Sequence, residues 1–386
     1  MTAKKTSAKL ADGRDLFYFD DAGSQLPADR KADTRNLDAR PAVAEMRLDA
    51  LSGDWISVAA SRHGRAFLPP ASECPLCPST DTFLSEVPDR FDVAVFENKN
   101  PSFGPDLAEV DDKNYWVEPN LPLGLTKPSI GRCEVVVFSP EHEGSLASQS
   151  ETRIRTILDA LADRTDAIMR MPGVRTVFPF ENRGQEIGVT LHHPHGQIYA
   201  YPYVTPTQEK VFASISRHGK NLFQDILEFE QGSERELIRG EHFTAFVPFA
   251  ARWPIEVSIL PHRHVQNLTE LSGDELAELT SVYSRVLRAV DAIYETPTPY
   301  VAGWHQAPNF DGGDNFRLQF KLTNGQVYER FLYIGMNEKG YNDNIDSSQN
   351  MISQLAYLCA QKGKRQVIRF VEGSSTLNDF TPRFGY

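Results

Sequence analysis

The densest group of chemically reactive side chains lies in LHHPHGQIYAYPY, residues 191–203, which holds three of the ten histidines. Alternate residues of a strand point to the same face, so His193, His195 and Gln197 should share a face if the strand is regular. One imidazole could attack a phosphoryl group there while the amide donates a hydrogen bond to a phosphoryl oxygen. Gly196 would let the backbone approach a ligand closely. The alternative is a histidine-rich metal site or surface loop.

A second group of candidate ligands is the cysteine pair of ECPLCP, residues 73–78. Two residues separate the cysteines, as in a zinc knuckle, and tetrahedral zinc needs two further ligands. A histidine follows the strand-like EVVVFSP, in the same repeat as the histidine cluster. The sequence therefore predicts one zinc site, formed by Cys74, Cys77, His142 and His193. A redox cysteine pair is the alternative, but it would need a helix at the motif, which the flanking prolines disfavour.

Strands and helices elsewhere in the chain should position these groups. Runs rich in β-branched and aromatic residues, bounded by glycine, proline or asparagine, predict strands. They cover residues 55–60, 92–98, 134–139, 174–180 and 187–191. Apolar residues at helical spacing predict a helix after Ser148, which would form a capping box with Glu151. A further helix is predicted from about Gln208 to Phe229.

The second half of the chain repeats the order of elements found in the first. EVVVFSPEH, residues 134–142, aligns without gaps on EVSILPHRH, residues 256–264. A helix follows in each copy, and the second opens with the capping pair Ser272 and Glu275. Each copy then returns to strand-like sequence, which in the second copy lies within residues 300–322. We interpret this order as an internal duplication, with chance similarity as the alternative.

Composition restricts the class of protein. The 386 residues are 40% apolar and 24% charged, which is typical of a folded globular chain. The formal net charge of −12 argues against a general nucleic-acid or anionic membrane surface. Four cysteines are too few for a disulfide scaffold, and we find no signal peptide or membrane-spanning run, so we expect a cytoplasmic protein. Residues 1–40 are polar with little periodicity and are predicted to form a flexible arm.

Several motifs together resemble a known family. HPHGQ, CPLC, the histidine after EVVVFSP and ENRG at residues 181–184 occur in the order found in galactose-1-phosphate uridylyltransferases, of the histidine-triad superfamily. The resemblance runs from about Arg40 to about Leu332. It implies a histidine-triad-like α+β fold with two related halves, each an antiparallel sheet with packed helices, and a homodimer. We accordingly divide the chain into a catalytic half with the zinc site, residues 41–205, and a second half, residues 206–386.

The resemblance also implies a reaction and the residues that perform it. UMP would pass from UDP-glucose to galactose 1-phosphate through a covalent uridylyl group on His195, with Gln197 stabilising the phosphoryl oxygens. The four candidate zinc ligands match those of the family, so Zn²⁺ is the expected cofactor. Substrate contacts are implied for Arg62, Arg65, Asn98, Asn182, Gly188 and Thr190.

The chain departs from the family pattern at three places, one of which is an extra histidine, His192, that we expect to face away from His193 and to bind no metal. Some members bind a second metal in the C-terminal half, and His305 matches one ligand of that site. Gln319 and Lys321 replace two further histidine ligands, so we predict no second metal. The Lys–Phe pair that contacts the sugar phosphate is also replaced, which leaves Arg330 and Phe331 as candidates and the acceptor sugar open.

Three other functions remain as alternatives. A related transferase could move AMP, because His195 and Gln197 would contact only the transferred phosphate. A zinc-stabilised nucleotide-binding protein without turnover is a second alternative, but the complete HPHGQ motif counts against it. A histidine-triad hydrolase is the third, and Gln197 in place of a third histidine counts against efficient hydrolysis.

Overall fold

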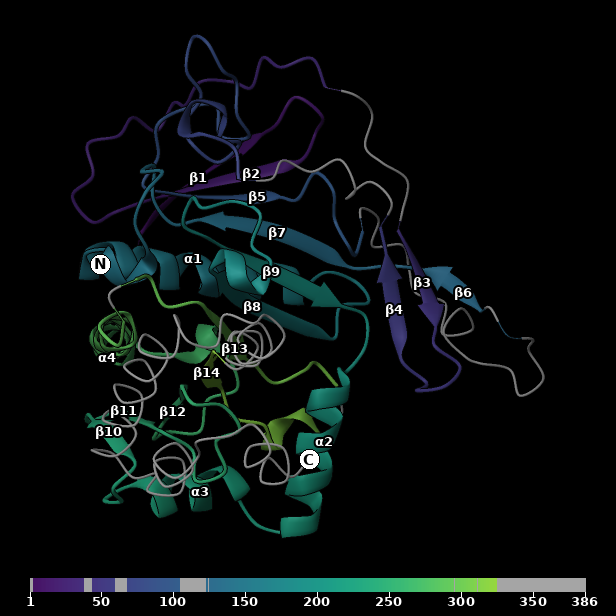
Figure 1. Ribbon diagram of the computed structural model, residues 1–386, viewed down its shortest axis with the longest axis vertical. Helices are drawn as coiled ribbons and strands as arrows, with labels where there is room; N and C mark the ends of the chain where they lie inside the picture. The colour runs from purple at the N-terminus through teal and green to yellow at the C-terminus, as the bar shows by residue number, and fades with distance from the viewer. Residues whose placement is uncertain are drawn as a thin grey trace, which may run out of the picture.

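One long sheet forms the centre of the protein in the computed structural model, which describes residues 3–37, 44–59, 68–104, 123, 125–294, 296–310 and 312–324 (Figure 1). Within these residues eleven strands pair antiparallel in the order β1-β2-β5-β7-β9-β8-β13-β14-β12-β11-β10. The strands of the first half are β1 (Lys4–Lys9), β2 (Asp15–Asp20), β5 (Val93–Glu97), β7 (Arg132–Val137), β8 (Thr176–Arg183) and β9 (His195–Tyr201). Those of the second half are β10 (Glu236–Arg239), β11 (Phe243–Phe246), β12 (Glu256–Pro261), β13 (Tyr300–His305) and β14 (Gln319–Thr323).

Two long helices cover one face of this sheet and pack against each other. They are α1 (Glu151–Met169) and α4 (Gly273–Asp291), and each turns an apolar stripe toward the sheet. The largest described core contains these stripes together with side chains from alternate positions of the central strands. Among the described residues, no long helix packs on the opposite face of the sheet in the region of β9 and β8.

The internal duplication is visible in the structure and confirms the predicted α+β architecture. The order strand, helix, strand, strand occurs as β7-α1-β8-β9 and again as β12-α4-β13-β14. Both helices have 19 residues and begin after a serine N-cap, Ser150 in the first and Ser272 in the second. The two halves join where β8 pairs with β13, so their sheets form one continuous surface.

The gapless alignment of EVVVFSPEH on EVSILPHRH is wrong for the strands. Val136 faces the helix-covered core, but its counterpart Ser258 points away, because Val257 and Ile259 fill the core on either side of it. A shift of one residue turns every side chain of a strand to the other face. β12 is therefore offset by one residue relative to β7, although the helices that follow remain equivalent.

The prediction of a flexible arm over residues 1–40 is wrong, because β1 and β2 extend the main sheet. β2 has the sequence DLFYFD and buries Leu16, Tyr18 and Phe19. β1 is an edge strand of the described sheet, and four residues of its polar sequence KKTSAK are exposed, Lys4, Lys5, Ser7 and Lys9. The polar composition of an edge strand therefore resembled that of a disordered segment.

Three other local predictions need correction. The N-cap of α1 is Ser150, whereas Ser148 closes a short 3₁₀ turn before it. The predicted helix from 208 to 229 is two helices, α2 (Pro206–His218) and α3 (Leu222–Glu230), which Gly219 separates with a φ of +71°. The predicted strand over residues 187–191 is a 3₁₀ turn and a loop.

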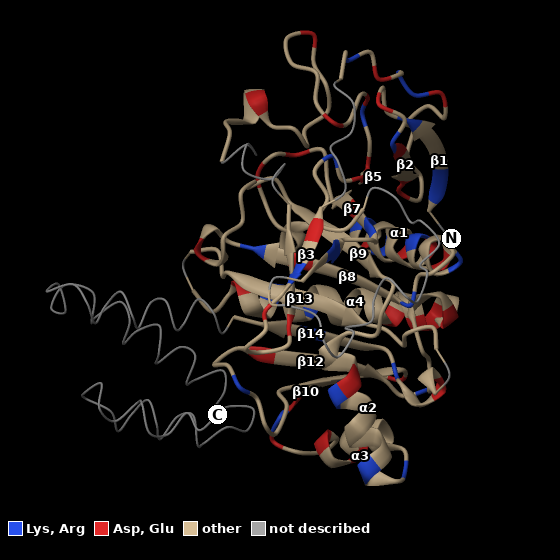
Figure 2. Ribbon diagram, turned by 90° about the vertical axis from the view of Figure 1, so that its right-hand side faces the viewer, with Lys and Arg blue, Asp and Glu red and all other residues tan. Residues whose placement is uncertain are grey.

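A second, three-stranded sheet lies beside the main body, with the order β4-β3-β6 (Figure 1). Its strands are β3 (Glu45–Leu48), β4 (Trp55–Val58) and β6 (Thr126–Pro128). Acidic and basic residues are interspersed along the described chain in Figure 2. Across the described ranges, no helix has both the length and the apolar composition that crossing a membrane requires.

Candidate active site

β9 presents two of the predicted reactive side chains on the face of the sheet opposite α1 and α4. Ile198 and Ala200 point into the helix-covered core, so His195 and Gln197 point to the other face. There they line a pocket of about 320 Å³, which we term the His195 pocket and which is in the size range of small-molecule sites. The same pocket is lined by the described candidates for substrate contact, Asn98, Asn182, Gly188 and Thr190.

Gly196 serves packing rather than the close approach to a ligand that the sequence suggested. It is buried, and a Cβ placed on it would lie 2.7 Å from Phe138 Cζ and 3.0 Å from the Phe180 carbonyl oxygen. Phe138 belongs to the helix-covered core, on the face away from the His195 pocket. Glycine at this position therefore allows the strand that carries His195 to lie against an aromatic ring.

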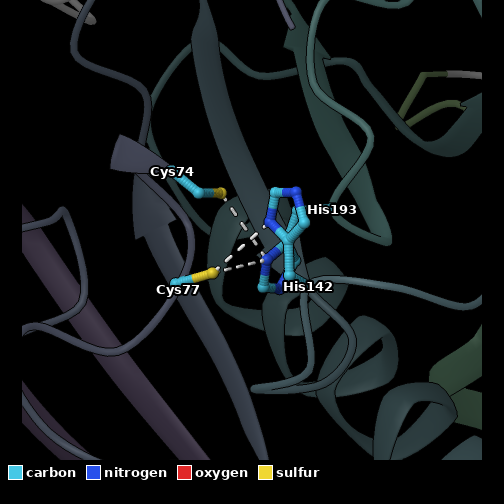
Figure 3. Close-up of side chains that lie close together, drawn as sticks. All are labelled: Cys74, Cys77, His142 and His193. Carbon is cyan, nitrogen blue, oxygen red and sulfur yellow. Dashed lines mark hydrogen bonds between the residues drawn. The ribbon is translucent and has the colours of Figure 1, made fainter. Parts of the chain in front are cut away.

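Four predicted metal ligands lie together beside the pocket and form the Cys–His cluster, which consists of Cys74, Cys77, His142 and His193 (Figure 3). Their ligand atoms all lie within 4.8 Å of one another. The Nδ1 atom of His193 lies 3.7 Å from Cys74 Sγ and 3.4 Å from Cys77 Sγ, and the Nδ1 atom of His142 lies 3.5 Å from Cys77 Sγ. Tetrahedral zinc with ordinary Zn–S and Zn–N bonds would place sulfur and nitrogen about 3.6 Å apart. The donor set and its spacing fit a tetrahedral metal.

A turn places the cysteines, and its contacts explain why the motif is not helical. Residues 71–73 form a 3₁₀ turn, after which the chain is extended at Cys74. Ser85 Oγ donates to the Cys77 carbonyl oxygen, and the Glu86 N–H donates to the Pro75 carbonyl oxygen at 2.9 Å. The expected absence of a helix at the motif is confirmed, which disfavours a thioredoxin-like redox pair.

Hydrogen bonds assign different roles to the two neighbouring histidines. His193 Nε2 lies 2.8 Å from the Ser139 carbonyl oxygen, so it carries the proton and leaves Nδ1 to face the cysteines. His195 Nδ1 lies 2.7 Å from the His193 carbonyl oxygen, so the neutral His195 ring has its lone pair on Nε2. The ligand histidine thus positions the second imidazole through its own backbone.

Electrostatics of the Cys–His cluster also favour a bound cation. Burial lowers the pKa of His193 to about 4, which keeps the ring neutral, as a metal ligand must be. Burial and the neighbouring Cys74 raise the pKa of the Cys77 thiol well above its ordinary value. Two adjacent thiolates are costly at this position unless a positive charge compensates them.

Sequence reasoning missed some residues of the pocket lining, and four of the residues it predicted are not among those the structure describes. Arg62, Arg65, Arg330 and Phe331 lie outside the described residues. Lining residues that were not predicted are Pro75, Leu76, Glu86, Phe96, Lys99, Asn100, Val135, Val189 and Leu191. Lys99 and Asn100 directly follow a predicted contact in VFENKN, which was an available signal. The others carried no local signal, because ordinary core and loop residues look the same in a sequence.

The positions related to a second metal lie on neighbouring strands of the main sheet, and one of them forms an ion pair. His305 lies opposite Gln319 in the register of β13 and β14. The ammonium group of Lys321 lies 2.7 Å from a carboxylate oxygen of Glu256. Burial, and then the charge of Lys321, lower the pKa of His305 to about 4. A cationic side chain therefore lies where the resemblance would place a ligand.

Comparisons with known proteins identify the family of this chain. The family model of the galactose-1-phosphate uridyl transferase N-terminal domain matches residues 36–205, and that of the C-terminal domain matches residues 207–323. The galactose-1-phosphate uridylyltransferase of Streptomyces lividans is 42% identical over 335 residues, which are 83% of this chain and 87% of the relative. The corresponding protein of Thermotoga maritima is 35% identical over 270 residues, which are 69% of this chain and 81% of the relative.

Solved structures show the same relationship. A uridylyltransferase structure superposes with a TM-score of 0.61 at 31% identity, covering 72% of this chain and 86% of that chain. An ADP-glucose phosphorylase from Arabidopsis thaliana with bound ADP-glucose superposes with a TM-score of 0.54 at 21% identity, over 73% of this chain and 88% of that chain, which shows the fold alone. The motifs, the duplicated fold and both family matches lead to one conclusion: this chain belongs to the galactose-1-phosphate uridylyltransferase family.

Proposed function

We propose that the protein transfers UMP from UDP-glucose to galactose 1-phosphate through a covalent uridylyl group on His195. The observation that carries this proposal is the hydrogen bond from His195 Nδ1 to the His193 carbonyl oxygen, in a ring that lines the His195 pocket. It places the lone pair of a neutral imidazole on Nε2, where a nucleophile needs it. The identity of the substrates is inferred from the family to which the chain belongs.

The reaction has two displacement steps. In the first, Nε2 of His195 forms a bond to the α-phosphorus of UDP-glucose, while the bond from that phosphorus to the bridging oxygen breaks. Glucose 1-phosphate leaves with the electron pair, and its low basicity makes a general acid unnecessary. In the second, a phosphate oxygen of galactose 1-phosphate attacks the same phosphorus, the N–P bond breaks and UDP-galactose is released.

The walls of the His195 pocket divide into polar and apolar parts that suit a nucleotide. The Gln197 amide is two residues from the nucleophile on the same face and can donate to a phosphoryl oxygen that becomes more negative during transfer. Asn182, Gly188 and Thr190 offer further donors near the phosphate, and Arg62 and Arg65 are proposed phosphate contacts. A flat base would fit the apolar wall, which includes Leu76, Phe96 and Val135, with Asn98 beside it.

The Cys–His cluster is proposed to hold Zn²⁺ in a closed, structural site. All four ligand positions come from side chains, so no open position is left for a substrate. Bound zinc would supply rigidity, because it ties the cysteine loop to the backbone that accepts the hydrogen bond from His195. We propose no second metal near His305.

The remaining proposals concern organisation. The protein is proposed to act in the cytoplasm as a homodimer on small molecules, without nucleic-acid or membrane partners. Exposed apolar side chains of the β3–β4 hairpin support a protein contact there, since Leu51 in its turn is 97% exposed and Ile56 in β4 is 52% exposed. The catalytic half would end near residue 205, before α2.

An exchange assay tests the proposal. Protein is incubated with UDP-glucose and labelled glucose 1-phosphate, without galactose 1-phosphate. We expect label to enter UDP-glucose, because the first step is reversible and needs no galactose 1-phosphate. His195→Asn should abolish this exchange. Exchange with ADP-glucose instead would favour an adenylyl transferase. Rapid release of free UMP would favour a hydrolase, and no reaction by zinc-loaded protein would favour a binding function.

A further inference from the structure

Three segments that are distant in the sequence meet at Glu86, in the wall of the His195 pocket. Glu86 Oε2 accepts a hydrogen bond from Arg14 Nη2 at 2.6 Å, and Oε1 accepts one from Arg35 Nη1 at 2.7 Å. The Glu86 side chain is 13% exposed, and that of Arg14 is fully buried. The Glu86 backbone also donates to Pro75 of the cysteine loop. The carboxylate is thus held from two sides while it lines the same pocket as His195.

Both arginines are themselves fixed. Arg14 Nε donates to Asp12 Oδ2 at 2.7 Å. Arg35 donates to both oxygens of Asp33, at 2.9 and 2.8 Å. A carboxylate has about four acceptor positions, so each oxygen of Glu86 keeps acceptor capacity after its arginine contact. The arrangement resembles a pre-organised acceptor more than an ordinary surface ion pair.

The net charge of the cluster around Glu86 determines which ligand groups it can contact. Three carboxylates, those of Asp12, Asp33 and Glu86, face two guanidinium groups, so the cluster is negative rather than positive. It would repel the diphosphate of a sugar nucleotide and attract neutral O–H or N–H donors. In a nucleotide such donors are the ribose hydroxyls and the imide N–H of the base. Carboxylates commonly accept hydrogen bonds from ribose hydroxyls in dinucleotide-binding proteins.

We infer that Glu86 is a specificity-determining residue, which accepts a hydrogen bond from an O–H or N–H donor of the nucleoside, and that Arg14 and Arg35 are its positioning residues. This inference rests on the proposed function of the His195 pocket and adds a contact to it. Both arginines precede residue 36, where the match to the N-terminal family domain begins. The segment that includes β1 and β2 therefore helps to select the donor nucleotide.

Modified donors test the inference directly. The kcat/KM of wild type is measured with UDP-glucose and with analogues that lack the 2′-hydroxyl, lack the 3′-hydroxyl or carry N3-methyluracil. We expect one analogue to lose about 10- to 100-fold, the value of a hydrogen bond to a charged group. Glu86→Ala should lower kcat/KM for UDP-glucose by a similar factor. In this variant the change from UDP-glucose to that analogue should lower kcat/KM little further, because the hydrogen bond is already absent. Asp20→Asn, which breaks an ion pair of β2 with Arg30 outside the pocket, should keep wild-type discrimination.

A second variant and a binding measurement separate the possible failures. Arg35→Gln should also weaken discrimination between UDP-glucose and the affected analogue, by a smaller factor than Glu86→Ala. Loss of stability alone would not change the ratio of the two kcat/KM values. Glu86→Gln serves the same test if Glu86→Ala does not fold. Calorimetric binding of UDP and its 2′-deoxy, 3′-deoxy and N3-methyl analogues needs no turnover, so a protein that discriminates without exchanging UMP would refute the proposed function alone. Unchanged discrimination in folded Glu86→Ala, or none in wild type, would overturn the inference.

Discussion

Replacement of Gly196 by alanine tests how the core positions the nucleophile. The added Cβ would lie 2.7 Å from Phe138 Cζ and 3.0 Å from the Phe180 carbonyl oxygen, and real Cβ atoms essentially never come closer than 3.0 Å. The carbonyl belongs to β8, which pairs with β9 on one side and β13 on the other, so its movement is restricted. Overpacking of this kind costs about 1–3 kcal/mol. We expect Gly196→Ala to be destabilised by that amount.

The same change should reduce activity, because the backbone of β9 must move to relieve the contact. A displacement of roughly 1 Å at a reacting group can cost about 100-fold in rate. The assay combines denaturant unfolding with the UMP exchange rate, and Phe138→Leu in the same chain should restore part of both losses. Gly273→Ala is the control, since nothing lies within 4 Å of its Cβ and its φ is not positive, so it should be neutral or stabilising by about 0.4–1 kcal/mol. A Gly196→Ala protein with native stability and native rate would refute the packing argument.

Two further predictions concern the metal and a buried acid. Cys74→Ser with Cys77→Ser should abolish zinc binding, measured by metal analysis, and lower thermal stability more than it changes the chemical step, whereas Cys133→Ala should retain zinc; unaltered zinc in the double variant would contradict the assignment. Burial raises the pKa of Glu181 from 4.5 to about 7, so the folded state holds this proton more tightly, and the free energy of unfolding should fall by about 3 kcal/mol as pH rises from 4.5 to 7. Glu181→Gln, whose amide oxygen can still accept from Tyr300, should remove this part of the pH dependence; an unchanged profile would show that Glu181 does not titrate there.

Local signals in the sequence were sufficient for the reactive groups and the duplication. HPHGQ and CPLC each lie within a few residues, so their chemistry could be interpreted without a fold. The elements of the two halves recur in order because each unit must bury one apolar face against a helix. The same reasoning failed at the strands of the repeat, since a one-residue offset between Val136 and Ser258 is invisible in a gapless alignment.

Contacts between distant residues could not be predicted in this way. Glu86 meets Arg14 and Arg35 across sequence separations of 72 and 51 residues, and nothing in the local sequence of any of the three indicates the others. The edge strand β1 has a polar composition because solvent covers one side of it, which resembles a disordered segment. The sequence indicated that another group lies close to the backbone at Gly196, but only the structure shows that this group is the Phe138 ring.

The most direct test of the covalent mechanism is the intact mass of the protein after exposure to UDP-glucose alone. We predict that the native chain gains the mass of one uridylyl group and loses it again when galactose 1-phosphate is added. His195→Asn should show no such gain, although its Cys–His cluster is unchanged. Native protein that exchanges UMP without ever carrying the adduct, or a His195→Asn variant that carries it, would contradict the account.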